Sequence, residues 1–175
     1  MSKITSCGVV ILNEEGEVLL AHATETTHWD IPKGQGDPGE SYVDTALRET
    51  REETGLQIDP TQLVDLGLFS YRHDKNLYLF ATRLSRIEAD IERCVCVSEF
   101  PRRRDGQMIP EMDAFRWTAI RDVDAYASSS LSRLFAQKLS LPDLHQRLPR
   151  VANGTALDTA SDSASSTPAG ADLSA

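Results

Sequence analysis

Short apolar, β-branched runs that end in polar turn residues recur through most of the chain, and this pattern is typical of β-strands. Ile4–Leu12 is the clearest run, and a turn at residues 13–16 returns the chain into a hairpin partner at residues 17–21. The remaining strands and extended segments are predicted at residues 28–31, 63–71, 76–84, 91–97 and 114–119. Residues 72–75 are predicted to form a turn, and residues 98–110 a polar loop.

The spacing of apolar residues becomes helical after residue 40. Ser41, with Asp44 three residues later, suits a helix N-terminus, and Gly55 suits a left-handed residue that ends the helix. The stripe suited to packing on a sheet consists of Val43, Ala46, Leu47, Thr50 and Thr54. Further helical segments are predicted at residues 122–127 and 131–139. Together these elements predict an α/β fold in which a mixed sheet carries a helix on each face.

Composition predicts how the chain is divided. With 175 residues, 40% of them hydrophobic, the chain is long enough for one domain with a proper core, expected at residues 1–148. Residues 149–175 are rich in Ala, Ser and Thr and contain almost no large apolar side chain. Such a segment buries too little surface to offset its ordering entropy, so we expect a disordered tail.

Charge and cysteine content exclude several classes of protein. A net charge of −9 makes the chain a poor general binder of duplex nucleic acid. No apolar stretch approaches the roughly 18 residues of a membrane span. The odd set Cys7, Cys94 and Cys96, without a secretory signal, argues against a disulfide framework, and a strand with Cys94 and Cys96 on one face is favoured over a metal site. We therefore expect a cytoplasmic location and predict no protein partner.

Three acidic residues of the helix after residue 40 are unusually placed. Glu49, Glu52 and Glu53 are separated by three and four positions, so their carboxylates fall within about 100° of one helix face. Like charges held so close repel one another, and a hard divalent cation with oxygen ligands, Mg²⁺ or Mn²⁺, relieves that repulsion. The alternative is an ordinary solvated acidic face. A loop rich in glycine, including Gly34, leads into this helix and allows tight turns beside a metal.

The run GQGDPGESYVDTALRETREETGL at residues 34–56 resembles the Nudix box, the signature of hydrolases that cleave nucleoside diphosphates linked to another group. The matching residues are Gly34, Glu40, Arg48, Glu49, Glu52, Glu53, Gly55 and Leu56. Thr50 stands where an aliphatic residue is more usual, which affects packing and not chemistry. The resemblance implies a Nudix-type α/β/α sandwich whose catalytic element is a loop, a helix and a second loop.

The resemblance also implies roles for individual residues. Glu49, Glu52 and Glu53 would ligate Mg²⁺ or Mn²⁺, with the backbone carbonyl of Lys33. Arg48, four residues before Glu52, would orient a catalytic glutamate, although an ordinary surface ion pair has the same spacing. The catalytic base is left open between the box residue Glu53 and a residue from a later loop. Glu111 is the later candidate, because the segment PEMDAFRW resembles one in diadenosine tetraphosphate hydrolases.

The segment HWDIPKG at residues 28–34 carries the substrate prediction. Its Pro-Lys-Gly looks more like asymmetric dinucleoside tetraphosphate hydrolases than like nucleoside triphosphate cleaners or RNA pyrophosphohydrolases. Expected substrate contacts are Lys33, Gly34, Lys75, Tyr71 and Phe115. Simpler readings remain for three of these: a solvated turn for Lys75, and sheet packing for Tyr71 and Phe115.

These residues predict a Mg²⁺-dependent pyrophosphohydrolase in which a metal-activated water attacks a nucleotide polyphosphate, such as diadenosine tetraphosphate, to give ATP and AMP. One alternative is a housecleaning nucleoside triphosphate pyrophosphatase, and diphosphoinositol polyphosphates or capped RNA come third. A different class is a non-catalytic Nudix domain that senses a nucleotide. That class typically loses box glutamates, and this chain keeps all of them.

Overall fold

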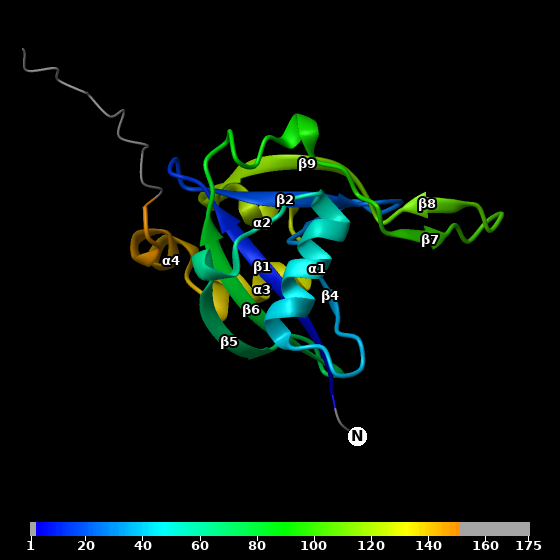
Figure 1. Cartoon of the computed structure of the whole chain (residues 1–175), viewed down its shortest axis with the longest axis horizontal. Coiled ribbons are helices and arrows are strands. Elements are labelled where there is room, and N and C mark those ends of the chain that lie inside the picture. The colour runs from blue at the N-terminus through cyan, green and yellow to red at the C-terminus, as the bar shows by residue number, and fades with distance from the viewer. Residues whose placement is uncertain (1–2, 151–175) are drawn as a thin grey trace, which may run out of the picture.

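The computed structural model describes residues 3–150, in which a mixed sheet is flanked by helices (Figure 1). Its strands are β1 (Ile4–Leu12), β2 (Glu17–Ala23), β3 (Trp29–Asp30), β4 (Lys33–Gln35), β5 (Val64–Ser70), β6 (Lys75–Arg83), β7 (Glu99–Pro101), β8 (Met108–Pro110) and β9 (Met112–Ala119). Its helices are α1 (Tyr42–Thr54), α2 (Val123–Tyr126), α3 (Ser129–Gln137) and α4 (Leu141–Arg147). Short 3₁₀ turns are η1 (Pro60–Gln62), η2 (Ile91–Arg93) and η3 (Ile120–Asp122). In this part of the chain, no helix is long and apolar enough to cross a membrane.

The main sheet is ordered β3-β2-β1-β6-β5, with β4 added to β1 and β9 added to β2. β1 runs parallel to β6 along its whole length, while the other pairings within the sheet are antiparallel. The sheet is therefore mixed, as the sequence predicts. The strands predicted at residues 63–71, 76–84 and 114–119 are confirmed as β5, β6 and β9 with small shifts at their ends.

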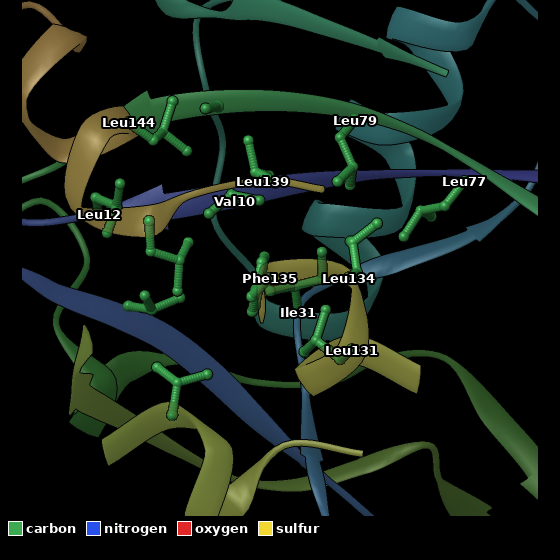
Figure 2. Packing of buried hydrophobic residues seen from close by; sticks show 14 of the residues in the cluster. Val10, Leu12, Ile31, Leu77, Leu79, Leu131, Leu134, Phe135, Leu139 and Leu144 are labelled. Carbon is green, nitrogen blue, oxygen red and sulfur yellow. The ribbon is translucent and has the colours of Figure 1, made fainter. Parts of the chain in front are cut away.

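Alternation along the strands sends side chains to two separate cores. One core joins residues such as Val10, Leu12, Leu77 and Leu79 of the sheet to α3 and α4, as Figure 2 shows for Leu131, Leu134, Phe135 and Leu144. The other core joins Val9, Ile11, Leu19 and Phe80 to Ala46 of α1. A helix layer thus covers each face, which confirms the predicted α/β/α sandwich (Figure 1).

Helix α1 begins and ends where the sequence predicts. The Ser41 hydroxyl accepts the N–H of Asp44, and Gly55 adopts φ 77° while its N–H donates to the Arg51 carbonyl. Thr50, the unusual residue of the box, is fully buried, and its hydroxyl donates to the Ala46 carbonyl at 2.8 Å. A threonine is accommodated in this core because its polar atom is satisfied within the helix.

The strand predicted at residues 91–97 is wrong. The segment forms η2 and then an irregular stretch, because its N–H groups bind the carbonyls at the end of α1. Val95 donates to the Thr54 carbonyl at 3.1 Å, and Val97 donates to the Glu52 carbonyl at 2.7 Å. The alternating apolar residues here belong to a segment that satisfies the last carbonyls of α1. Cys94 and Cys96 therefore do not lie on one face of a strand.

Two further elements differ from the prediction. Residues 98–110 contain the hairpin of β7 and β8, where a polar loop was expected. Helix α4 was not predicted, although Ser140 caps it, Pro142 lies in its first turn, and Leu141 and Leu144 are buried. The predicted tail falls mainly on residues 151–175, outside the described part of the chain, so the boundary at residue 148 stays a prediction.

Arg83 fastens α4 to the sheet, and its side chain is only 4% exposed. Its guanidinium donates to the carbonyls of His145, Leu148 and Pro149 and pairs with Glu14 at 3.1 Å. We expect Arg83→Met to lower the free energy of unfolding by about 3 kcal/mol, because these acceptors would be left buried and unpaired. Urea denaturation measures this loss. Arg86→Met, which removes a more exposed arginine, should change stability by less than about 0.5 kcal/mol, and an equal loss in both variants would contradict the assignment.

Candidate active site

The site forms where the sheet splits. β1 and β2 pair only near their turn, at Leu12 and Val18, and then diverge. β3 pairs with β2, and β4 pairs with β1. Residues 31–32, which join β3 to β4, therefore cross from one half of the sheet to the other. The second half of α1 faces the gap between these two halves. The Lys33 N–H of β4 donates to the Glu53 carboxylate, and Gly34 of β4 lies beside the Glu49 carboxylate.

Gly34 lies so close to Glu49 that a side chain at residue 34 would require the Glu49 carboxylate to move. A Cβ atom on Gly34 would lie 2.1 Å from the Glu49 carboxyl carbon and from one of its oxygens. The Glu49 side chain is nearly buried, so it has little room to retreat. The requirement for glycine at this position therefore comes from close approach of the β4 backbone to a carboxylate.

Arg48 is the hub of the acidic cluster. Its guanidinium binds Glu40 through Nε at 2.9 Å, Glu49 through NH1 at 2.8 Å and Glu52 through NH1 at 3.0 Å. It also donates to the Gln35 carbonyl at 3.0 Å, which ties α1 to the loop before it. The Arg48–Glu52 contact expected from the sequence is present, but it is one of three carboxylate contacts. These carboxylates raise the pKa of the Arg48 guanidinium, chiefly through the hydrogen bonds that Arg48 donates to Glu40.

Glu53 faces the other side of the opening. It is 3% exposed, and one carboxylate oxygen accepts the Lys33 backbone N–H at 3.0 Å. The pKa of the Glu53 carboxyl is raised to about 8. Burial is the main cause, the negative charges of Glu49 and Glu111 act in the same direction, and Lys33 lowers the pKa in part. Burial, with Glu52 and Glu111 nearby, also raises the pKa of Glu49. Negative charge is therefore costly at these two positions, and a cation would be favoured there.

Glu111 approaches the cluster from the start of β9. Its charge acts on both Glu49 and Glu53, and its backbone is fixed on both sides. The Glu111 N–H donates to the Ser98 carbonyl at 2.9 Å, and its carbonyl accepts the Thr24 N–H at 3.0 Å. The structure thus brings together the two candidates that the sequence left open for the catalytic base.

The lysine before the box is not directed into open space. The Lys33 ammonium forms a largely buried ion pair with Asp30 at 2.8 Å. Burial lowers the pKa of Lys33, but the carboxylates of Asp30 and Glu53 outweigh burial and raise it overall. Asp30 therefore fixes the position of the Lys33 ammonium through this ion pair. The sequence analysis did not identify Asp30 as a site residue. The signal for this role was the spacing of three between Asp30 and Lys33.

Lys75 differs from Lys33 because its ammonium has no hydrogen bond or ion pair within residues 3–150. It is half-buried at the start of β6, and burial lowers its pKa, as do the nearby positive charges of Lys33 and Arg72. Three cations therefore gather near the carboxylates of Asp30 and Asp74. A phosphate group would give the Lys75 ammonium a direct partner there.

The two aromatic candidates also lie near Asp30. Tyr71 is 8% exposed and packs in the core against α3, and the charges of Asp30 and Lys33 both reach its hydroxyl. Phe115 lies opposite Ala21 of β2, which in turn pairs with Asp30 of β3. Phe115 is thus two strands, or about 10 Å, from Asp30 across the sheet.

Glu40 is the second residue whose role sequence reasoning missed, although it matches the box. Its carboxylate accepts from Arg48, from the Asp37 N–H at 3.0 Å and from the Thr45 hydroxyl at 2.9 Å. The Arg48 hydrogen bonds are the main reason that the pKa of Glu40 falls from 4.5 to about 2. Glu40 therefore holds the glycine-rich loop, the helix and Arg48 in one arrangement.

Glu40→Gln is expected to lower the free energy of unfolding by about 2 kcal/mol at pH 7, because charged hydrogen bonds are lost. Since folding depresses the pKa of Glu40, this stabilisation is present above about pH 4.5 and is lost as pH falls toward about 2. Urea denaturation of both proteins at pH 7 and pH 3 should show the gap narrowing with acid. A gap that is constant with pH would contradict the assignment.

The site thus combines a carboxylate-bearing helix in a split mixed sheet with Arg48 among the carboxylates and Lys33 and Lys75 at the border. Comparison with known families gives the class of protein. The NUDIX domain model matches residues 3–137, so the chain belongs to the Nudix family. It is a Nudix hydrolase, an enzyme that acts on phosphorus anhydrides.

Three relatives illustrate the similarity. An uncharacterized 17.7 kDa protein of enterobacteria phage T4 is 37% identical over 122 residues, covering 65% of this chain and 80% of that protein. The asymmetrical bis(5'-nucleosyl)-tetraphosphatase of Mus musculus is 26% identical over 160 residues, covering 83% and 95%. The crystal structure of a C. elegans Ap4A hydrolase binary complex matches with a TM-score of 0.51 and 23% identity, covering 76% and 93%. The last of these shows a shared fold.

Proposed function

We propose that this enzyme is a Mg²⁺-dependent pyrophosphohydrolase that cleaves a dinucleoside polyphosphate, with diadenosine tetraphosphate giving ATP and AMP. The observation that carries the proposal is the half-buried Lys75 beside Lys33 and Arg72, whose ammonium has no ion pair or hydrogen bond among residues 3–150. A cationic group there, next to the carboxylates of α1, suits a phosphate chain longer than the part being cleaved. The mouse and C. elegans relatives, which are named for such substrates, give independent support.

The residues present fit a divalent metal by their chemistry. Glu49, Glu52 and Glu53 offer hard oxygen ligands, and the backbone carbonyl of the neighbouring Lys33 offers a further oxygen ligand. In residues 3–150 no three acidic, histidine or cysteine side chains already converge as a ligand set, because Arg48 occupies Glu49 and Glu52. A metal must therefore compete with Arg48 for these oxygens. When bound, it would screen phosphate charge and activate water.

The remaining steps belong to the chain itself. Glu53 or Glu111 accepts a proton from the attacking water, and Arg48 keeps Glu52 and Glu49 oriented. Lys75 holds the phosphates that leave, and the paired Lys33 and Asp30 fix the β4 backbone beside Glu53. Tyr71 and Phe115 border the site for a nucleoside.

The competing enzyme function is a housecleaning nucleoside triphosphate pyrophosphatase. Measuring kcat/KM for diadenosine tetraphosphate and for the common nucleoside triphosphates, each with Mg²⁺, separates the two. We expect the dinucleotide to be preferred by at least about tenfold, which corresponds to about 1.4 kcal/mol. A clear preference for triphosphates would overturn the proposed substrate and leave the Nudix chemistry in place.

Lys75→Met is expected to raise KM for diadenosine tetraphosphate about tenfold with little change in kcat, because a ground-state phosphate contact is lost. Lys138→Met is the matched control, since this exposed lysine binds the Ser70 carbonyl outside the carboxylate cluster. Steady-state kinetics on both variants make the comparison. An unchanged KM in Lys75→Met would exclude Lys75 from phosphate binding.

A further inference from the structure

A hairpin arm, defined here as residues 98–111, stands apart from the main sheet. β7 and β8 pair only with each other, with Phe100 opposite Ile109 (Figure 1). Met108 is 50% exposed on this arm, and Val97 at its base is 66% exposed. The arm thus presents apolar side chains to solvent at its base and along its length, where a ligand could contact them.

The base of the arm is built into the active site. Val97 and Ser98 donate their N–H groups to the Glu52 carbonyl at 2.7 and 3.3 Å, and Ser98 accepts from Glu111. Cys96 reinforces this junction, because its sulfur accepts the Met112 N–H at 3.4 Å. The arm therefore starts between a proposed metal ligand and a proposed base. Five residues from Ser98 to the tip extend it by about 16 Å from that point.

The tip of the arm carries positive charge on an acidic protein. Arg102 folds onto Asp105, with nitrogen–oxygen contacts at 3.0 and 2.6 Å, which holds the turn. Arg104 contacts the same carboxylate at 3.4 Å while staying 73% exposed. Arg103 is exposed and has no ion pair or hydrogen bond within residues 3–150. Exposed guanidinium groups beside apolar side chains suit a ligand that has both phosphate and a base.

We propose that the hairpin arm binds the distal nucleotide of the substrate, meaning the nucleoside and adjoining phosphate that lie farther from the carboxylates of α1 than the phosphates being cleaved. Arg103 and Arg104 contact its phosphate or stack on its base, and Met108 contacts the base. The proposal rests on the proposed function, and it makes the arm the element that separates dinucleoside polyphosphates from mononucleotides. A mononucleotide bound at the carboxylates has no second nucleoside to reach the arm.

The test uses the full chain and two substrates that share a tetraphosphate, namely diadenosine tetraphosphate and adenosine 5′-tetraphosphate. The variant is Arg103→Ala with Arg104→Ala. We expect KM for the dinucleotide to rise about tenfold, with kcat unchanged and with less than about a twofold change for the mononucleotide. Arg121→Ala is the matched control, because Arg121 is also exposed beside an aspartate, Asp122, at the opposite end of β9.

Each outcome decides the proposal. Equal changes for both substrates would mean that the arginines act only through the general field of the protein, and unchanged KM values would mean that the arm does not touch substrate; either result overturns the inference alone. A wild-type enzyme that cleaves the mononucleotide and not the dinucleotide would overturn the proposed function together with the arm's role. A matching loss in Arg121→Ala would also count against the arm.

Discussion

Replacing Glu52 with Gln is expected to lower kcat about a thousandfold while KM changes only a few fold. Glu52 is the most exposed of the three glutamates of α1, with a third of its side chain accessible, and it shares Arg48 with Glu49. Glutamine keeps the shape and removes the charge that a metal requires, so the loss falls on the chemical step. Steady-state kinetics with diadenosine tetraphosphate and saturating Mg²⁺ measure it.

Thermal denaturation must accompany this measurement. The melting temperature of Glu52→Gln should equal or exceed that of the wild type, because one of several crowded negative charges is gone. Glu92→Gln, at an exposed position in η2, should retain full activity. Full activity in Glu52→Gln would remove this residue from the mechanism, and absence of turnover in both variant and wild type would favour a nucleotide sensor.

Gly34→Ala is expected to lower kcat about a hundredfold. The new Cβ atom would occupy the position of the Glu49 carboxyl group, so either β4 or the carboxylate must move by about an ångström. We expect a displacement of that size at a catalytic carboxylate to lower kcat strongly and to change the free energy of unfolding little. Kinetics and circular dichroism on the same sample separate the two effects.

Gly36→Ala is the matched control for that substitution. It lies on the same loop, and its added Cβ would meet the Thr45 hydroxyl at 2.8 Å and not a carboxylate of α1. We expect its kcat to fall much less than that of Gly34→Ala. Similar losses in the two variants would show that loop geometry in general, and not the approach to Glu49, sets the requirement for glycine.

Helix α1 shows how much of the site the sequence could predict. Its caps at Ser41 and Gly55 are local signals, and both are confirmed. The periodicity of its acidic residues predicts that Glu49, Glu52 and Glu53 gather around a metal, and this stays a prediction. The sequence could not predict that these three glutamates have different partners. Glu53 turns to the Lys33 backbone and Glu49 to Arg48, because β4 lies alongside α1 only in the folded sheet.

Long-range contacts account for the features that sequence reasoning missed. Residues 91–97 were predicted to be extended like a strand, but the N–H groups of Val95 and Val97 donate to carbonyls of α1, some forty residues away along the chain. Glu40 matched the box pattern, but the sequence assigned it no role. Its role follows from the three groups that donate hydrogen bonds to its carboxylate in the fold. Arg83 carried no local signal, since its acceptors lie more than sixty residues away along the chain in both directions.

Product analysis by anion-exchange chromatography, after incubation with diadenosine tetraphosphate and Mg²⁺, tests the central claim most directly. The account predicts ATP and AMP in equal amounts, with no products when a chelator is in excess. Two molecules of ADP would contradict asymmetric cleavage. Undiminished turnover in excess chelator would contradict the role of Glu49, Glu52 and Glu53 as metal ligands.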